Sequence, residues 1–119
     1  MVLVDTSVWV SHLRHGEPTL SAFLTDAEVM SHDLVIGEMA CGHLKSRKEI
    51  LSLLQALPRT PVVTQEELLH FIDTHSLSGL GIGFIDIHLL ASAKLVGVPL
   101  WTFDKELKRA TAKLGILHV

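Results

Sequence analysis

Residues 2–10, VLVDTSVWV, decide how the fold begins, because an apolar run ends there on a carboxylate. Residues 2–4 are apolar and mostly β-branched, which predicts a short buried strand. Residues 6–13 predict a helix that ends near Gly16. Asp5, between the two, has two interpretations. It either caps the helix or forms one wall of a metal site.

The bulk composition fits a single domain over residues 1–119. Apolar residues make up 48% of the chain, charged residues only 19%, and the mean hydropathy is +0.40. A chain this apolar often covers part of its surface with a second copy, so we expect a homodimer. The net charge is −3, and the sequence has neither a long basic run nor an acidic tail.

Cysteine content and hydropathy indicate the compartment. The single cysteine, Cys41, excludes an internal disulfide and fits a reducing cytoplasm. The N-terminus lacks a basic segment followed by an apolar one, so we expect no signal peptide. No uninterrupted apolar stretch reaches the roughly 18 residues that a membrane helix needs. We therefore expect a cytoplasmic protein that does not involve a membrane.

Segments typical of strands alternate with helical segments along the chain. Short strands are predicted at 2–4, 28–31, 62–63, 100–103 and 116–119. Helices are predicted at 6–13, 18–24, 34–47, 48–57, 64–77, 85–95 and 105–113. The segment 48–57 either continues the preceding helix or forms a separate one. The alternation indicates an α/β fold with a parallel sheet covered by helices on both faces.

Two local motifs lie in the middle of the chain. Thr64, with Glu67 three places on, matches a capping box and predicts a helix start. The segment SGLGIGF at 78–84 is rich in glycine but lacks the Lys-Ser/Thr pair of a phosphate-binding Walker loop. We interpret it as a flexible connection that lets the backbone come near a site.

Acidic residues occupy positions where an α/β sheet can bind a ligand. Two predicted strands end on Asp5 and Asp104, and parallel strands place both at the edge where such sheets bind ligands. Asp86 lies in the first turn of helix 85–95, and Glu38 lies inside the apolar segment LVIGEMA. Singly, each has an ordinary explanation. Asp5 and Asp104 could be helix caps, Asp86 could interact with the helix dipole, and Glu38 could be a surface acid.

Taken together, the four acids favour a cation site. Converging carboxylates repel one another and are costly without a cation. Ligation by oxygen alone suits Mg²⁺ or Mn²⁺ rather than structural zinc. Subtracting these four from the 13 acids leaves 9 against 10 Lys plus Arg, so the remainder is slightly basic, as binding of a polyanion requires. Metal ions held by carboxylates suggest phosphodiester chemistry.

Four motifs carry a resemblance to a known family. LVDTSVWV, VIGEMACG, GFIDIHLLASAKL and LWTFDKEL occur in the order and spacing of a PIN domain, and more closely of a VapC-type toxin of a type II toxin–antitoxin (VapBC) system. The resemblance implies a PIN-like three-layer α/β/α fold with a mostly parallel sheet of about five short strands. It also implies a metal-dependent endoribonuclease that cuts structured RNA and blocks translation. A homodimer and a VapB-like antitoxin whose tail occupies the acidic groove are implied as well.

The same resemblance assigns roles to single residues. It places the four catalytic, metal-binding acids on Asp5, Glu38, Asp86 and Asp104. It also assigns supporting positions to the small polar residues Ser7 and Thr102. Where many relatives have a further aspartate, this chain has Glu106, whose longer carboxylate could hold a metal through water.

Basic residues and histidines offer further candidates. Plausible contacts to RNA phosphates are Arg14, Lys45, Arg47, Lys48 and Lys105. Each could equally belong to a solvated helix face. The eight histidines include no second Cys/His pair at zinc-finger spacing. His88, on helix 85–95, is expected to be a satisfied core or rim histidine.

Two other functions remain open from the sequence. A phosphoacceptor, receiver-like signalling domain has a similar length and alternation, but it needs an aspartate at the end of its third strand. That strand here ends on Thr64. A PIN interaction module that has lost its chemistry is the second alternative, and the complete set of four acids argues against it.

Overall fold

The elements alternate as predicted, and the computed structural model describes residues 1–118; Val119 lies outside the described residues. The elements in chain order are β1 (Val2–Val4), α1 (Thr6–His15), α2 (Pro18–Thr25), β2 (Val29–Met30), α3 (Asp33–Cys41), α4 (Arg47–Ala56), α5 (Gln65–Thr74), α6 (Phe84–Val96), β3 (Leu100–Trp101) and α7 (Lys105–Lys113). The strands form a parallel sheet in the order β2–β1–β3. Leu3, at the centre, pairs with Met30 on one side and Leu100 on the other.

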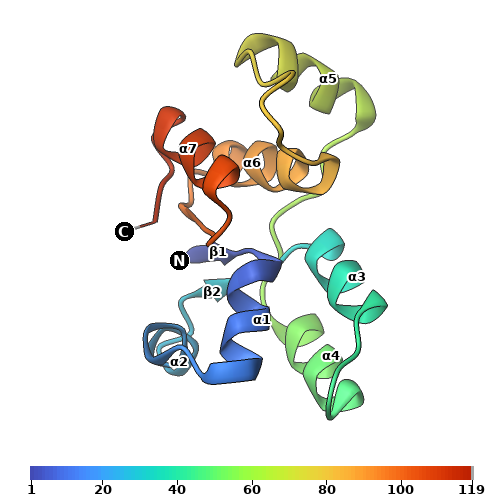
Figure 1. Ribbon diagram of the computed structural model, residues 1–119, viewed down its shortest axis with the longest axis vertical. Coiled ribbons are helices and arrows are strands. Elements are labelled where there is room, and N and C mark those ends of the chain that lie inside the picture. The colour runs from blue at the N-terminus through green and yellow to red at the C-terminus, as the bar shows by residue number, and fades with distance from the viewer. Residues whose placement is uncertain (119) are drawn as a thin grey trace.

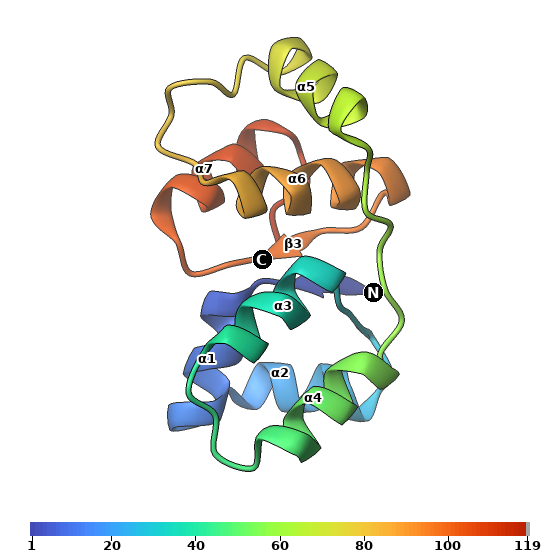
Figure 2. The same cartoon turned by 90° about the vertical axis from the view of Figure 1, so that its right-hand side faces the viewer.

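Helices cover both faces of this sheet, which confirms the predicted three-layer α/β/α arrangement. Helices α1 to α4 lie on one side, and α5 to α7 lie on the other (Figure 1). Figure 2 shows α1, α6 and α7 all starting at the left-hand side of that view, where β1 ends. The first turns of three helices therefore meet at the carboxyl edge of the parallel strands, where ligands bind in sheets of this class.

The sheet is narrower than predicted. The strand at 62–63 is wrong, because the outer partner of β2 is a single bridge between Ser31 and Arg59. Pro58 and Pro61 bracket this bridge, and a proline has no N–H to extend a ladder. The predicted strand at 116–119 is reduced, within the described residues, to one bridge between Leu100 and Leu117.

Helix boundaries differ from the prediction at two places. Residues 34–47 do not form one helix, because α3 ends at Cys41 and α4 starts separately at Arg47. Ser46, directly before α4, has a left-handed backbone with φ of 52°, which no continuous helix allows. Helix α5 ends at Thr74 instead of residue 77. Its predicted capping box is confirmed, since the side chains of Thr64 and Glu67 each bond the other's backbone N–H.

The hydrophobic core surrounds β1 and one helix. Val2, Leu3 and Val4 are buried on both faces of the sheet, as the central strand of a covered parallel sheet requires. In α6 every residue from 87 to 93 is buried, which agrees with its apolar sequence. Each fully buried leucine contributes about 1.5–3 kcal/mol relative to an exposed one. No helix within residues 1–118 is long and apolar enough to span a membrane.

Candidate functional site

Asp5 is both a helix cap and the centre of a hydrogen-bond network. It immediately follows β1, and its side chain is 4% exposed. Its Oδ1 accepts from the Thr6 N–H at 2.7 Å. Its Oδ2 accepts from the hydroxyls of Ser7 at 2.8 Å and Thr102 at 2.7 Å. The two interpretations of Asp5 are therefore compatible, because the cap uses one oxygen and the hydroxyls orient the other.

The end of β3 joins the same network. The backbone N–H of Asp104 donates to Thr102 Oγ1 at 3.0 Å, and that of Phe103 donates to Ser7 Oγ at 3.0 Å. Asp104 also caps α7, since its Oδ1 accepts from the Leu107 N–H at 2.8 Å. Ser7 and Thr102 thus tie the ends of two neighbouring strands together, which explains why both strand ends carry small hydroxyl residues.

Glu38 reaches the site from α3. Its carboxylate is half-buried, and Oε1 accepts from the Thr6 hydroxyl at 2.7 Å. A half-buried carboxylate needs a partner or a cation. Thr6 is that partner, and sequence reasoning did not assign it. The only available signal was its position beside Asp5 at the start of α1, because the bond spans 32 positions in the chain.

Asp86 lies within electrostatic range of the other three acids. It lies in the first turn of α6 and accepts no hydrogen bond from another residue within 1–118. Its pKa is raised from 3.8 to about 7, mostly by burial and then by the charges of Asp5, Asp104 and Glu38 in that order. Three of the four predicted acids therefore act on the fourth at electrostatic range, although they come from separate elements.

The four acids offer the ligand atoms that a hard cation prefers, but they are not grouped as a complete metal site. All four side chains offer carboxylate oxygens, the ligands that Mg²⁺ and Mn²⁺ prefer. Among residues 1–118, however, no three Asp, Glu, His or Cys side chains are already grouped as ligands of one ion. The cost of holding Asp86 ionised beside three other acids is the feature that a divalent cation would relieve.

The Glu106 carboxylate forms an ion pair with Arg109 on the same helix. Both its oxygens accept from the guanidinium of Arg109, at 3.0 and 3.2 Å, on the exposed side of α7. The glycine-rich connection passes beside it, since a Cβ at Gly81 would lie 3.9 Å from Glu106 Cγ. Gly81 has a φ of +75°, which favours glycine.

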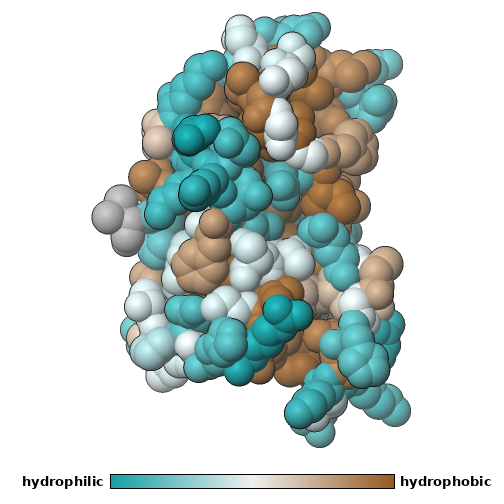
Figure 3. All heavy atoms as spheres, in the orientation of Figure 1, coloured by the Kyte–Doolittle hydropathy of each residue, from teal (hydrophilic) through white to brown (hydrophobic). Residues whose placement is uncertain are grey.

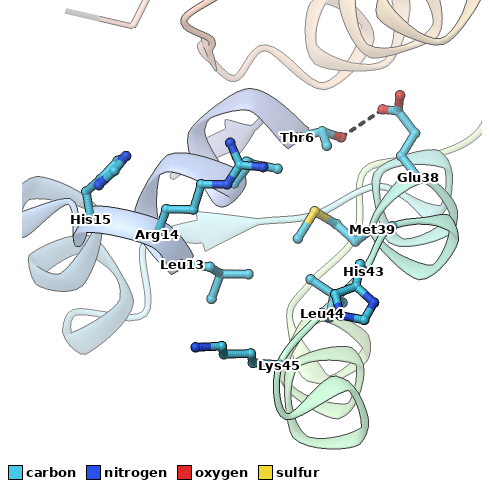
Figure 4. A pocket seen from close by; sticks show the side chains of 11 residues that line it. Thr6, Leu13, Arg14, His15, Glu38, Met39, His43, Leu44 and Lys45 are labelled. Atoms are coloured by element: carbon cyan, nitrogen blue, oxygen red, sulfur yellow. Dashed lines mark hydrogen bonds between the residues drawn. The ribbon is translucent and has the colours of Figure 1, made fainter.

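A cavity of about 570 Å³ borders one of the four acids, Glu38, and brings two of the predicted phosphate contacts together. Arg14 and Lys45 line it together with Glu38. In Figure 4 the Arg14 side chain lies on the side of the Thr6–Glu38 hydrogen bond, and Lys45 lies at the far end. Leu13 and Met39 lie between them. The cavity is therefore apolar in the middle and cationic at two places.

The other three predicted phosphate contacts lie elsewhere. Arg47 and Lys48 line a separate hollow along α4, and the Arg47 guanidinium donates to the Ala40 carbonyl at 2.6 Å. Lys105 is exposed and follows Asp104 directly at the start of α7. Lys105 thus lies next to Asp104, whereas the α4 pair lies outside the cavity that borders Glu38.

Two buried histidines, His32 and His88, lie close to one another. His88 is buried, as predicted, but its Nδ1 has no hydrogen-bond partner within the described part of the chain, so it is not satisfied. Its ring centroid is 6.5 Å from that of His32, whose Nδ1 caps α3 by accepting from the Leu34 N–H at 3.0 Å. Burial lowers the pKa of both histidines, and His88 lowers that of His32 further. Both therefore favour the neutral form.

Comparison with known proteins agrees with the geometry. A protein-family model described as "PIN domain" matches residues 2–113, a span that includes all four acids. The chain belongs to the PIN domain family. The PIN assignment replaces the receiver-like alternative.

Two curated PIN relatives cover nearly the whole chain. Each is named Ribonuclease VapC32, from Mycobacterium tuberculosis strains CDC 1551 and H37Rv. Each is 47% identical over 117 residues, which is 98% of this chain and 94% of the relative. The likeness therefore extends over the sheet, both helical layers and the acidic edge.

Proposed function

We propose that this PIN domain is a VapC-type endoribonuclease, the toxin of a toxin–antitoxin pair, which cuts RNA in the cytoplasm and so inhibits translation. The observation that supports the proposal best is that Asp86, at the start of α6, lies within electrostatic range of Asp5, Asp104 and Glu38, whose charges add to the effect of burial in raising its pKa. The 47% identity to proteins named as ribonucleases over nearly the whole chain supports the same activity.

Asp5, Glu38, Asp86 and Asp104 are the residues that would hold Mg²⁺, or Mn²⁺ in its place. When bound, such a cation supplies a water of lowered pKa and neutralises charge on the oxygens of a phosphodiester. The protein's part is to hold the carboxylates in place. Ser7 and Thr102 fix one oxygen of Asp5, Thr6 fixes one oxygen of Glu38, and the cap of α7 fixes one oxygen of Asp104.

Asp86 differs from the other three, because no group within residues 1–118 donates a hydrogen bond to its carboxylate. With a pKa of about 7, this carboxyl is partly protonated near neutral pH in the absence of metal. Cation binding requires the ionised form, so it should release a proton and depend on pH.

The cavity beside Glu38 supports a route for the RNA backbone. Arg14 and Lys45 there offer charges for phosphates, and Lys105 offers another beside Asp104. Arg47 and Lys48 are proposed as weaker, outer contacts along α4. Glu106, paired with Arg109, is proposed to act on a bound metal only through water.

A homodimer and a VapB-like antitoxin partner belong to the same proposal. Several aliphatic side chains are largely exposed, among them Leu53, Leu69, Leu95 and Val96. Figure 3, which shows the molecule from the side seen in Figure 1, has hydrophobic surface in both the upper and the lower part of the view. Contact with a second copy would cover part of this area. The antitoxin's tail is proposed to occupy the acidic groove and compete with RNA.

The test is RNA cleavage by the purified protein with Mg²⁺, with Mn²⁺ and with excess EDTA. We expect cleavage with either metal and none with EDTA or with Asp86→Asn. The matched control is Asp73→Asn, the same change at an exposed position on α5, which should cleave like the wild type. Cleavage that persists in EDTA would contradict the metal mechanism. No cleavage under any condition would favour the inactive interaction module.

A further inference from the structure

Five buried side-chain atoms lack a hydrogen-bond partner within residues 1–118, and three of them come from segments that pack together. These three are His32 Nε2, Thr60 Oγ1 and His88 Nδ1. Their residues are exposed by 0%, 3% and 6%. Buried polar atoms of native proteins are nearly always paired, so three neighbouring exceptions indicate a shared partner from outside the chain.

The backbone beyond β2 gives two of these side chains the same direction. Ser31 bridges Arg59 in parallel register, and the Thr60 N–H donates to the Ser31 carbonyl at 2.9 Å. Side chains alternate between the two faces of a sheet, and His32 continues the extended conformation of Ser31. His32 and Thr60, each one position beyond the bridged pair, therefore leave the sheet on the same face.

Helix α6 covers this face of the sheet. The ring centroid of His88 is 6.5 Å from that of His32. Ser92, one turn further along the same side of α6, donates to the Pro61 carbonyl at 2.5 Å. Since Pro61 directly follows Thr60, the three unpaired atoms belong to segments that contact one another.

The cap of α3 fixes the position of the proton on the His32 ring. Nδ1 accepts from the Leu34 N–H at 3.0 Å, so it carries no proton, and the ring proton is on Nε2. Burial and His88 lower the pKa of His32, whereas Asp33 and the Pro61 carbonyl raise it, so this carbonyl is near the ring. It forms no hydrogen bond with Nε2, however. The buried Nε2–H group therefore still needs an acceptor.

The distance between the two histidine rings decides what can lie between their nitrogens. A direct N–H···N bond brings two imidazole centroids to roughly 5 Å. One tetrahedral zinc ion, at about 2.0–2.1 Å from each nitrogen, also brings them to roughly 5 Å. Two hydrogen bonds through one water give roughly 6.5 Å. The observed 6.5 Å matches the water and is too long for the other two arrangements.

We infer that one buried water accepts from His32 Nε2 and donates to His88 Nδ1 and Thr60 Oγ1. A water accepts and donates in this way with two to four polar partners in protein interiors, so all three orphan atoms become paired. His32 and His88 thereby act as positioning residues, because the water joins the helices to which they belong.

These two helices carry two of the proposed cation ligands. His32 caps α3, which contains Glu38, and His88 belongs to α6, which contains Asp86. Within residues 1–118 no direct hydrogen bond joins α3 to α6. The water therefore holds the two helices in a fixed relative position. This consequence rests on the proposed function, whereas the water itself does not.

The variants separate the water from the cap and from the packing of the rings. His32→Asn keeps the α3 cap, because asparagine is a good cap, but its side chain is too short to replace Nε2. His88→Phe keeps a ring and removes Nδ1, and His88→Asn restores a polar atom near the position of Nδ1. His70→Asn and His70→Phe are the matched controls, at an exposed position on α5.

The water is tested in the metal-free protein by NMR. In the wild type, ¹⁵N spectra should place the His32 proton on Nε2, and this proton should show a nuclear Overhauser effect to a long-lived water. The effect should be lost in His88→Phe and should return in His88→Asn. The two His70 variants should leave it unchanged.

The positioning role is tested by Mn²⁺ affinity, measured by EPR of the free ion. His32→Asn and His88→Phe should each weaken binding by about 2- to 30-fold, the usual range for residues that couple two parts of a site. The double variant should bind no more weakly than the more affected single variant, because either change removes the same link. His88→Asn should recover most of the affinity, and the His70 variants should bind like the wild type.

Two results would overturn the inference. One is a His32 Nε2–H proton that contacts no water and couples directly to a His88 nitrogen. The other is an additive loss of Mn²⁺ affinity in the double variant, which would mean two separate packing defects. Failure of the proposed function looks different. If the wild type neither cuts RNA nor binds Mn²⁺, the positioning role falls with that function, and the water signal still decides the link between the histidines.

Discussion

Asp5 and Asp86 are both predicted ligands, yet the protein treats the two carboxylates in opposite ways. Asp5 accepts three hydrogen bonds and is almost fully buried. Asp86 accepts none from the rest of residues 1–118, and burial with three neighbouring charges raises its pKa to about 7. One half of the site is therefore organised by the fold itself, whereas the other half needs a cation to be stable in its ionised form.

The largest expected effect is the loss of RNA cleavage in both Asp5→Asn and Asp86→Asn. An amide has nearly the volume of a carboxylate but lacks the charge that binds a hard cation. Cleavage of a labelled RNA with saturating Mg²⁺ measures the effect, and circular dichroism checks that both variants fold. Full activity in either variant would remove that residue from the metal site.

Relative to the wild type, the two variants should change the stability of the fold in opposite directions. At pH 8 without metal, Asp86→Asn should be more stable than the wild type, because it removes a charge that the fold disfavours. The gain should be about 1–3 kcal/mol, because solvent around this partly exposed carboxyl reduces the full value of about 1.4 kcal/mol per pKa unit. At pH 5, Asp5→Asn should be less stable by about 1–3 kcal/mol, because the hydroxyls of Ser7 and Thr102 lose a charged acceptor. Urea unfolding at each pH measures both values.

The pH dependence follows from the raised pKa. The unfolded chain ionises Asp86 near its ordinary value of 3.8, whereas the folded protein does so only near 7. Stability from the protonated form is thus complete below the lower value and is lost as pH rises through the upper one. The difference between wild type and Asp86→Asn should therefore grow between these values and then level off. A difference that is constant with pH would contradict the assignment.

The sequence predicted where the acids lie better than it predicted the hydrogen bonds that hold them. Asp5 and Asp104 could be placed on one edge because parallel strands share their direction, and this needs only the strand order of local segments. The bond between Thr6 and Glu38 depends on how α1 and α3 pack, which no local pattern encodes. The same holds for the exposure of Phe84, since an apolar residue at a helix start is normally expected inside.

Tertiary packing also explains why one strand was predicted wrongly from the sequence. Residues 62–63 have strand propensity, but Val63 instead packs with Leu68 and Ile87 beneath α5 and α6. Propensity is weak where tertiary packing offers a better place for the side chain. Helix α6 was predicted nearly to its ends because its apolar length and the glycine that follows act locally.

A smaller effect is expected for the hydroxyls that hold Asp5. Ser7→Ala and Thr102→Val should each lower metal affinity or activity by about 10- to 100-fold, the usual cost of removing a group that orients a metal ligand. Mg²⁺ titration of RNA cleavage separates the two cases, since excess metal should restore a variant that has lost only affinity. The matched control is Ser21→Ala, on the exposed surface of α2, which should change neither quantity.

The smallest effect concerns the pKa of Asp86 in single charge-removing variants. Asp5→Asn should lower this pKa most, Asp104→Asn less and Glu38→Gln least, because the three charges act on Asp86 with that order of strength. In each variant the pKa should stay above 3.8, because burial is the largest cause and remains. Carboxyl ¹³C NMR titration of metal-free protein measures the three values. Asp104→Asn is the most informative, since asparagine caps a helix about as well as aspartate and so preserves the start of α7. If that variant leaves the pKa of Asp86 unchanged, Asp104 acts only as a helix cap, and the site contains three acids instead of four.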